Sequence, residues 1–478
     1  MKRYIKIAVL GLLIVHLYGQ DGFNCFSIIA GKDCTVDGSV LFGHNEDDGG
    51  DQIVNMYKVP RLKHTPDEII TLKNGGKCQQ VALTNAYIWL EMPGMEFSDG
   101  YLNEHNVVIA SDNCPSKEDQ PELTDGGIGY WLRRLMAERA ASAREAVKIG
   151  GQLIEKYGYT ASGRTYCIAD PHEAWVMCVV NGKHWVAQRV PDDKVMIIPN
   201  YYMIQEIDLS DTLNFVGSDD IIEYAISRGW YNPQKDGKFN YREAYGVDWS
   251  INHQHNINRQ WGGLRLIAKD KFGLNDHFPF AVKPKKKIGL EDVFAVLRDH
   301  YEGTEMENEN HGKTPHDHDN RPICTLETQY GFVAQLSSGL PREIAGVMWY
   351  APVQPCLHPF VPVYLHTQHF PSTFAYEDYK SGLKLHFYEN YDSIRSQLYD
   401  HSFQIFARFS LWVNEDYYGR SVEILEQIAK YQLEILDEQE KFRMQLLQKI
   451  ETDVSNVQNI VTDYSNKNLR LLNSFQLD

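Results

Sequence analysis

The chain has 478 residues, and its 47 lysines and arginines against 64 aspartates and glutamates leave a formal net charge of -17 at pH 7. This acidic balance argues against nucleic acid as a partner, because a phosphate backbone needs a basic surface, and otherwise it only favours solubility. No apolar stretch beyond residue 19 reaches the length of a membrane helix, so we expect no membrane span after that point.

The first 19 residues have the composition of a secretory signal peptide. Basic side chains precede an apolar run, residues 7–17, that is too short to span a bilayer as a mature helix. Signal peptidase prefers small residues before the cut, so Gly19 is the best end for the leader, and residues 20–24 remain as a short propeptide. We therefore expect an exported protein, either periplasmic or secreted.

Cys25 follows Asn24 and opens a strand-like run. Self-cleavage after Asn24 would make Cys25 the first residue, where its thiol and its own α-amine form a nucleophile and a base. This pattern is typical of an N-terminal-nucleophile hydrolase. The alternative is a lipid-anchored protein in which Cys25 carries the lipid, but residues 22–24 form a poor lipobox that is detached from the apolar run.

A β-hairpin is predicted within residues 25–48. If Lys32 to Asp37 form its loop, Cys25 lies directly opposite His44. An imidazole beside the thiol, with the Asp47 carboxylate three residues on, suits both a thiolate and an α-ammonium. The alternative interpretation is that the charged run that ends at Asp48 only solvates the end of a strand.

The following elements mix helices with antiparallel strands. A helix is predicted from Ser142 to Gly158, because Ser142 and Glu145 have the spacing of a capping box. A second β-hairpin is predicted over residues 174–190, because Asn181-Gly182 separates two apolar runs. Without regular alternation of strands and helices, this mixture indicates an α+β layered fold.

The C-terminal part of the chain predicts a long amphipathic helix over residues 421–450. Its apolar side chains recur at three-to-four spacing among many charges, as Leu425, Ile428, Ile435, Phe442, Leu446 and Ile450. Such a helix packs on the body of the protein or on a partner subunit, which would make the chain a homo-oligomer. We expect one catalytic domain, residues 25–380, and a helical extension, residues 381–478.

Cysteine usage and one histidine-rich segment bear on disulfides and metals. The eight cysteines are Cys25, Cys34, Cys78, Cys114, Cys167, Cys178, Cys324 and Cys356. If Cys25 is a free nucleophile, seven remain and complete disulfide pairing is impossible. No CxxC pair suggests zinc, and Cys167 and Cys178 are expected as small apolar core residues. The segment His311, His316, Asp317, His318 and Asp319 matches no common zinc spacing, so we expect a surface loop near the site and no metal or other cofactor.

Several ordered segments resemble the dipeptidase A and secernin family of cysteine peptidases, which is related to the choloylglycine hydrolases. The similar segments are residues 25–48, 103–110, 163–176, 185–193, 343–349 and 360–364. They cover most of the chain from residue 25 to about residue 380. The resemblance implies a four-layer αββα fold and hydrolysis of amide bonds, usually those of dipeptides, without a metal.

The resemblance also implies roles for individual residues. Cys25 would attack the scissile carbonyl, its freed α-amine would carry the proton, and Asp47 would hold that amine and the thiol. Asn113 and Asn200 would donate to the oxyanion. Arg259 would be a distant arginine of the site, with Arg265 as the alternative. An alternative interpretation stays open for Asn113 and Asn200, as turn residues beside proline. For Arg259 the alternative is a solvated charge at a strand edge.

One position departs from the family. Many relatives have arginine where this chain has His44, and histidine is fully charged only below its usual pKa of about 6.5. Either His44 shares a proton with Asp47, or another cation replaces the arginine, or the enzyme is weaker than its relatives.

The substrate of such a site is a small peptide with a free ammonium, which Glu46, Asp48 or Asp112 could hold. The alternative activity is that of an amidase for non-peptide acyl amides of the bile-salt or penicillin type, which would need an apolar acyl slot. The third alternative is the lipid-anchored, non-catalytic binding protein.

Overall fold

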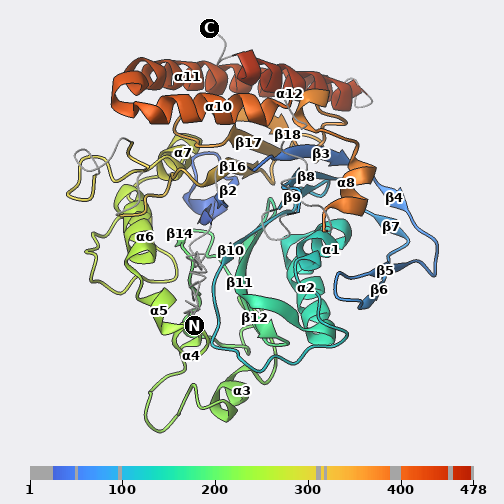
Figure 1. The fold of residues 1–478 in the computed structure, drawn as a ribbon, viewed down its shortest axis with the longest axis vertical. Coiled ribbons are helices and arrows are strands. Elements are labelled where there is room, and N and C mark those ends of the chain that lie inside the picture. Colours follow the sequence, from blue (N-terminus) through green and yellow to red (C-terminus); the bar gives the residue numbers. More distant parts are fainter. Residues whose placement is uncertain are drawn as a thin grey trace, which may run out of the picture.

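The computed structural model describes residues 25–48, 52–94, 99–307, 314–316, 320–387, 400–450 and 456–474. The predicted leader and propeptide therefore lie outside the described residues. Two large antiparallel sheets stack on each other, and helices cover the outer face of each (Figure 1). The chain thus has the mixed α+β architecture that the sequence predicts, with the layers in the order helix, sheet, sheet, helix.

The first sheet contains the strand that follows Cys25. Its six strands are, in order, β14 (Val195–Ile198), β1 (Phe26–Ala30), β2 (Val40–Asp47), β16 (Thr328–Leu336), β17 (Gly346–Pro352) and β18 (Val361–Tyr364). On its outer face, α6 (Gln254–Ile267) packs on β14, and α7 (Leu290–Leu297) packs on β2 and β16. Strand β2 is therefore central, with neighbours on both edges and packed layers on both faces.

The second sheet has eight strands and a two-helix cover. Its strands are, in order, β15 (Phe215–Gly217), β13 (Trp185–Arg189), β12 (Ala174–Gly182), β11 (Tyr159–Ala169), β10 (Val108–Asn113), β9 (Gly100–Asn103), β8 (Tyr87–Glu91) and β3 (Asn55–Val59). The cover consists of α1 (Trp131–Arg139), on β9 and β10, and α2 (Ala143–Tyr157), on β11, β12 and β13. Two small hairpins project beside it, β4 (Leu62–Lys63) with β7 (Leu83–Thr84) and β5 (Ile69–Thr71) with β6 (Lys77–Gln79).

The apolar run in β12 shows how the layers are built. Val176 and Cys178 join the core between the two sheets, whereas Trp175 and Met177 join the core beneath α1 and α2. Side chains alternate between the faces of a strand, so a strand buried on both faces must be apolar at nearly every position. Cys167 and Cys178 are both fully buried in the core between the sheets, as predicted.

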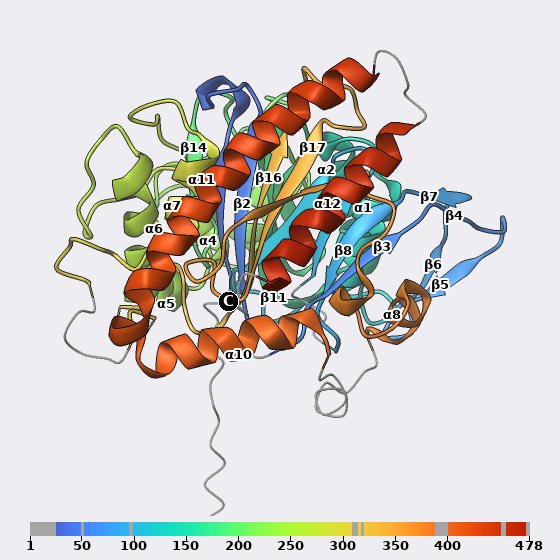
Figure 2. The same cartoon turned by 90° about the horizontal axis from the view of Figure 1, so that it is seen from above.

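The remaining helices surround these layers. They are α3 (Ile221–Ser227), α4 (Tyr241–Tyr245), α5 (Asp248–Ile251), α8 (Tyr379–Leu385), α10 (Ser402–Glu415), α11 (Tyr417–Ile450) and α12 (Val457–Ser474), with short 3-10 turns η1 (Lys32–Cys34) and η2 (Ser372–Phe374). Figure 2 shows α11 and α12 running across the strands of the first sheet, and both helices contact β18.

The predicted amphipathic helix is confirmed as α11, and its apolar side is turned to the body of the same chain. Ile435 and Leu446 are buried in the core that lies between and around the two sheets. Packing on the body is thus one of the two arrangements that the pattern allowed, and contact with a partner subunit stays a prediction. Within the described part of the chain, no helix combines the length and the apolarity needed to cross a bilayer.

The predicted helix and hairpin in the middle of the chain are confirmed. Helix α2 is capped by Ser142, whose side chain accepts from the Glu145 backbone at 3.2 Å, and it ends at Gly158 with φ 78°. The hairpin joins β12 to β13, with Gly182 at φ 102°. Its loop is one residue longer than a two-residue turn, because Val179 pairs with Trp185.

The register predicted for the first hairpin is wrong. Ser27, not Cys25, lies opposite His44, and Phe26 lies opposite Asn45. The loop is longer than expected because residues 32–34 form the η1 turn and Thr35 bridges to Ile288, which delays the return strand. Continuing the register places Cys25 beside Glu46.

The attachment of α11 to the body can be tested at Gln432. This buried side chain accepts from the Phe360 amide at 2.8 Å and donates to the Phe360 carbonyl at 3.0 Å, and it also accepts from Arg298 at 2.9 Å. Gln432→Leu leaves these partners unpaired, so we expect unfolding free energy to fall by about 1–3 kcal/mol. Urea unfolding measures it, with Leu433→Ala, at an exposed position of the same helix, as the control. Equal stability of the two variants would contradict the docking described here.

Candidate active site

Cys25 is the first described residue and stands immediately before β1. Its side chain is fully buried, and its backbone has φ 74°, a left-handed conformation that non-glycine residues rarely adopt. The thiol donates to Oε1 of Glu46 at 2.7 Å. Burial, followed by the negative charges of Glu46, Asp48 and Asp112, raises the pKa of the Cys25 thiol well above its ordinary value. The raised pKa favours the protonated thiol in this arrangement, and Glu46 accepts a hydrogen bond from it.

Strand β2 divides the charged run after Cys25 between two faces. His44 faces the inside of the two-sheet stack, where its ring lies 5.6 Å from that of Phe332. Asn45 faces outward and donates to the carbonyl of Leu297 in α7 at 2.8 Å. By the two-residue period of a strand, Glu46 joins His44 inside and Asp47 lies outside. The run is thus not a solvated strand end, since these four side chains are fully buried.

The inner face forms a hydrogen-bonded cluster around His44. Its Nδ1 lies 2.8 Å from the hydroxyl of Ser27, which in turn donates to Asp112 at 2.8 Å. Its Nε2 lies 3.2 Å from Oε2 of Glu46. One ring nitrogen of His44, one oxygen of Glu46 and the sulfur of Cys25 all lie within 4.8 Å of one another. The imidazole is thus coupled to the thiol through Glu46.

The cluster holds a single mobile proton between His44 and Glu46. Because the Ser27 hydroxyl donates to Asp112, its oxygen accepts from Nδ1 of His44, which leaves Nε2 to interact with Glu46. Burial lowers the pKa of His44 and raises that of Glu46 to about 7. Both shifts favour the neutral pair, in which the proton lies on Glu46. The proton partner of His44 is therefore Glu46, where the sequence suggested Asp47.

On the outer face, Asp47 is held by two partners from the segment before and at the start of β16. It accepts from the hydroxyl of Thr328 at 2.7 Å and pairs with Arg321 at 3.2 Å. Burial raises the pKa of Asp47, and the Arg321 charge opposes that shift. In this arrangement the Cys25 thiol contacts Glu46, because the strand period turns Glu46 and Asp47 to opposite faces. That Asp47 holds the amine and the thiol stays a prediction.

Arg259 connects α6 to Cys25. Its guanidinium donates to the Cys25 carbonyl at 2.8 Å, to Oδ1 of Asn200 at 2.6 Å and to Oδ1 of Asn256 at 2.7 Å. Burial and the nearby Arg321 lower its pKa to about 10, so it stays charged at neutral pH. Arg265, the alternative position, pairs instead with Asp299 at 2.5 Å. The structure thus brings Arg259, and not Arg265, to the cysteine.

The two candidate oxyanion donors have fixed amide groups. Asn200 follows β14, and because Arg259 holds its amide oxygen, the NH2 group is the part that can face a substrate. Asn113 ends β10, where its amide oxygen accepts from Ser162 at 3.5 Å and its register partner is Arg164. Asn113 is thus a strand residue, whereas Asn200 lies in a bend beside Pro199 and is fully buried.

Two arginines that the sequence analysis did not single out supply positive charge to the site. Arg164 of β11 is buried, donates to Ser111 at 2.8 Å, and lowers the pKa of the Cys25 thiol by its charge. Arg133 of α1 is also buried, and its charge lowers the pKa of Glu46. Both charges also lower the pKa of His44. The one sequence signal for Arg164 was that it is the only charged residue of its strand.

The histidine-rich segment is only partly described. His311, Asp317, His318 and Asp319 lie outside the described residues. His316 is fully buried, which corrects the prediction of a surface loop at this position. Its surroundings contain histidine and cysteine rather than groups of the cluster around Cys25.

Comparison with known proteins identifies the family. The model of Peptidase family C69 matches residues 24–411, which is most of the chain. The chain belongs to peptidase family C69. It is therefore a member of a hydrolase family, and the resemblance seen in the sequence is confirmed.

Relatives of this C69 protein include bacterial dipeptidases. It is 27% identical over 372 residues to a probable dipeptidase of Latilactobacillus sakei, covering 75% of this chain and 78% of that protein. It is 26% identical over 346 residues to dipeptidase A of Lactobacillus helveticus, covering 69% and 72%. Among solved structures, penicillin V acylase from Agrobacterium tumefaciens matches 69% of this chain and 86% of its own, at 12% identity and a TM-score of 0.31.

Arg259 and Arg265 provide a matched test of the site. Arg259→Lys cannot bridge the Cys25 carbonyl and two amide oxygens at once, so we expect hydrolysis to fall by about a hundredfold. Arg265→Lys, six residues along the same helix, keeps its single ion pair and should retain activity within a few fold. The measurement is kcat/KM for a dipeptide, with circular dichroism as the folding check. A similar loss in both variants would show that the helix, not the guanidinium at Cys25, is what matters.

Proposed function

We propose that this C69 protein is an exported cysteine dipeptidase of the N-terminal-nucleophile type, matured by self-cleavage before Cys25. The observation that carries the proposal is the setting of Cys25: a buried thiol 2.7 Å from a carboxylate, with its carbonyl held by Arg259. The helix, sheet, sheet, helix order of the layers supports the four-layer αββα assignment. A cysteine that carried a lipid would need an exposed side chain, so the burial of Cys25 favours a nucleophile over an anchor.

Maturation supplies the base. Cleavage converts the Cys25 amide nitrogen to an α-amine with an ordinary pKa of about 7.7–8.0, which can accept a proton at neutral pH. The left-handed φ of Cys25 costs free energy in the uncleaved chain. Cleavage breaks the peptide bond whose carbonyl carbon defines this φ, so the new amino-terminal residue is no longer held in that conformation. Export by the leader, residues 1–19, and removal of residues 20–24 are separate steps of this proposal.

Hydrolysis then proceeds in two acyl transfers. The Cys25 sulfur attacks the scissile carbonyl as its proton moves to the α-amine, and the amide NH2 groups of Asn113 and Asn200 donate to the oxyanion. The proton passes to the leaving amine, the carbon–nitrogen bond breaks, and the acyl group remains on sulfur as a thioester. Water attacks the thioester by the same route, which releases the second amino acid and restores the thiol. Asp47, fixed by Arg321 and Thr328, holds the α-amine.

The substrate ammonium is the feature that selects a dipeptide. Glu46 lies directly at the thiol, Asp112 is joined to Glu46 by three hydrogen bonds through His44 and Ser27, and the charge of Asp48 acts on Cys25. An ammonium placed among these carboxylates would replace their mutual repulsion with attraction. A neutral acyl group offers no such compensation, which favours dipeptides over non-peptide acyl amides.

The first test concerns maturation and the nucleophile. We expect the active chain to begin at Cys25, and Cys25→Ala to lose hydrolysis completely and to begin at residue 20, because only signal peptidase can then act. Intact-mass analysis and amino-terminal sequencing measure both. Cys34→Ala, at another buried free cysteine, is the control and should mature and turn over normally. Active protein that begins at residue 20 would refute self-cleavage, and turnover by Cys25→Ala would refute the nucleophile.

The second test concerns the pH dependence that Glu46 imposes. Since its pKa is raised to about 7, Glu46 loses its charge as pH falls below 7, in the range where the α-amine is also protonated. Both groups must be unprotonated, so log kcat/KM for a dipeptide should rise with a slope of about 2 on the acid side. In Glu46→Gln the slope should be about 1, whereas Glu305→Gln, at an exposed position, should keep the original profile.

The same variant separates dipeptidase from acylase. Acetylation of the dipeptide amine should raise KM in the native enzyme, because the carboxylates lose their ammonium partner, and should matter much less in Glu46→Gln. Equal or faster hydrolysis of acetylated substrates by the native enzyme would establish the acylase alternative instead.

A further inference from the structure

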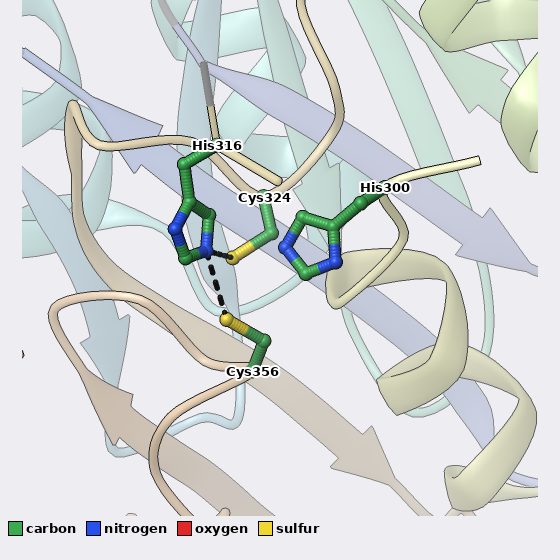
Figure 3. A group of neighbouring side chains, drawn as sticks. All are labelled: His300, His316, Cys324 and Cys356. Carbon is green, nitrogen blue, oxygen red and sulfur yellow. Dashed lines mark hydrogen bonds between the residues drawn. The ribbon is translucent and has the colours of Figure 1, made fainter. Parts of the chain in front are cut away.

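Four metal-binding side chains converge at a second place in the fold, beside α7 and beneath the C-terminal helices. Figure 3 shows His300, His316, Cys324 and Cys356 facing one another. All four are buried, and one ligand atom from each lies within 4.8 Å of those of the other three. His300, His316 and Cys324 lie on the connection between α7 and β16, and Cys356 lies between β17 and β18. None takes part in the hydrolysis described above.

We propose that these residues form a structural zinc site of the Cys2His2 type. Two thiolates and two imidazoles are the ligands that Zn2+ takes in closed tetrahedral sites, and the two thiolates neutralise its charge. Bonds of about 2.3 Å to sulfur and 2.0–2.1 Å to nitrogen place tetrahedral ligand atoms roughly 3.3–3.8 Å apart. Nε2 of His316 lies 3.0 Å from the Cys356 sulfur and 3.8 Å from the Cys324 sulfur, so small shifts complete the geometry.

Both imidazoles are oriented for this role by hydrogen bonds on the opposite nitrogen. Nδ1 of His316 lies 2.7 Å from Oδ1 of Asn414, and Thr314 donates to the same oxygen at 2.7 Å. Nδ1 of His300 lies 2.8 Å from a carboxylate oxygen of Glu302. In each ring the hydrogen is therefore on Nδ1, where it forms a hydrogen bond. Nε2 keeps its lone pair for a metal, as metal-binding histidines require.

The environment of Nε2 of His300 is not explained if the cluster holds no metal. It is buried and, among the described residues, has no hydrogen-bond partner of acceptable geometry. A buried polar atom without a partner costs free energy, so such an atom beside two thiols needs an explanation. A disulfide between Cys324 and Cys356 would leave the Nε2 atoms of both histidines without the thiol donor. A zinc ion satisfies all four ligand atoms at once.

The site would fasten three parts of the fold together. Asn414 of α10 is hydrogen-bonded to His316, and the Tyr417 ring of α11 lies edge-on to the His316 ring at 5.6 Å. Cys324 follows Arg321, the partner of Asp47, by three residues. A metal held here by four protein ligands has no open position for a substrate, so its role is to fix the C-terminal helices and the Arg321 segment on the body.

Metal analysis of the full chain tests the site directly. After purification under reducing conditions and dialysis, we expect one zinc per chain by elemental analysis. Replacement with Co2+ should give the intense visible bands of tetrahedral cobalt and the near-ultraviolet charge-transfer bands of cobalt–thiolate bonds. Cys356→Ser should lose both signals, whereas Cys78→Ser, at a buried cysteine outside the cluster, should keep them.

A second variant keeps all four ligands, so it tests the site without the risk that loss of a ligand unfolds the chain. Asn414→Ala removes the oxygen that accepts from His316 and Thr314, so we expect a folded chain whose zinc affinity, measured by chelator competition, is about 10- to 100-fold lower. The proposal is overturned if the chain binds neither zinc nor cobalt stoichiometrically, if Cys356→Ser keeps its metal, or if peptide mapping finds a disulfide between Cys324 and Cys356. These readouts do not depend on turnover. A fall in hydrolysis on zinc removal would follow only if the proposed function also holds.

Discussion

The central position of β2 is the constraint on which the rest of the structure depends. The strand has partners on both edges, helix α7 on one face and the second sheet on the other, so each side chain of residues 40–47 must be buried. The last four of them are polar or charged. Their burial is tolerated only because the strand period sends them alternately to two different sets of partners.

The buried titratable groups on the two faces of β2 are compensated in different ways. On the outer face, the Asp47 carboxyl pairs with Arg321 and accepts from the Thr328 hydroxyl. On the inner face, burial favours neutral groups, and Glu46 and His44 share a proton next to the Cys25 thiol. An ion-paired carboxylate thus lies on one face of the strand, and a titratable pair lies beside Cys25 on the other face. Titratable groups with shifted pKa values are common at functional sites.

The C-terminal helices belong to the same body. Helix α11 binds the backbone of Phe360 through Gln432, and α12 binds the backbone of Tyr364 through Ser465 at 3.0 Å. Near the other end of the first sheet, the histidine and cysteine cluster joins α10 to the segment that carries Arg321. The helical extension thus contacts the first sheet and the segment before β16.

The sequence by itself determined the elements whose signals are local. The capping residue at Ser142, the turn at Asn181-Gly182 and the apolar spacing in α11 each lie within a few residues of the structure they predict. The family resemblance drew attention to Cys25 and to Arg259, which was expected as a distant arginine of the site and lies 2.8 Å from the Cys25 carbonyl. Only the tertiary structure decided which face each charged residue of β2 occupies, because the η1 turn and the Thr35 bridge set the register. The same holds for His300, His316, Cys324 and Cys356, whose spacing in the chain matches no motif. Three of them lie on the long connection between α7 and β16, and Cys356 lies between β17 and β18, so the four meet only when the sheets and helices pack.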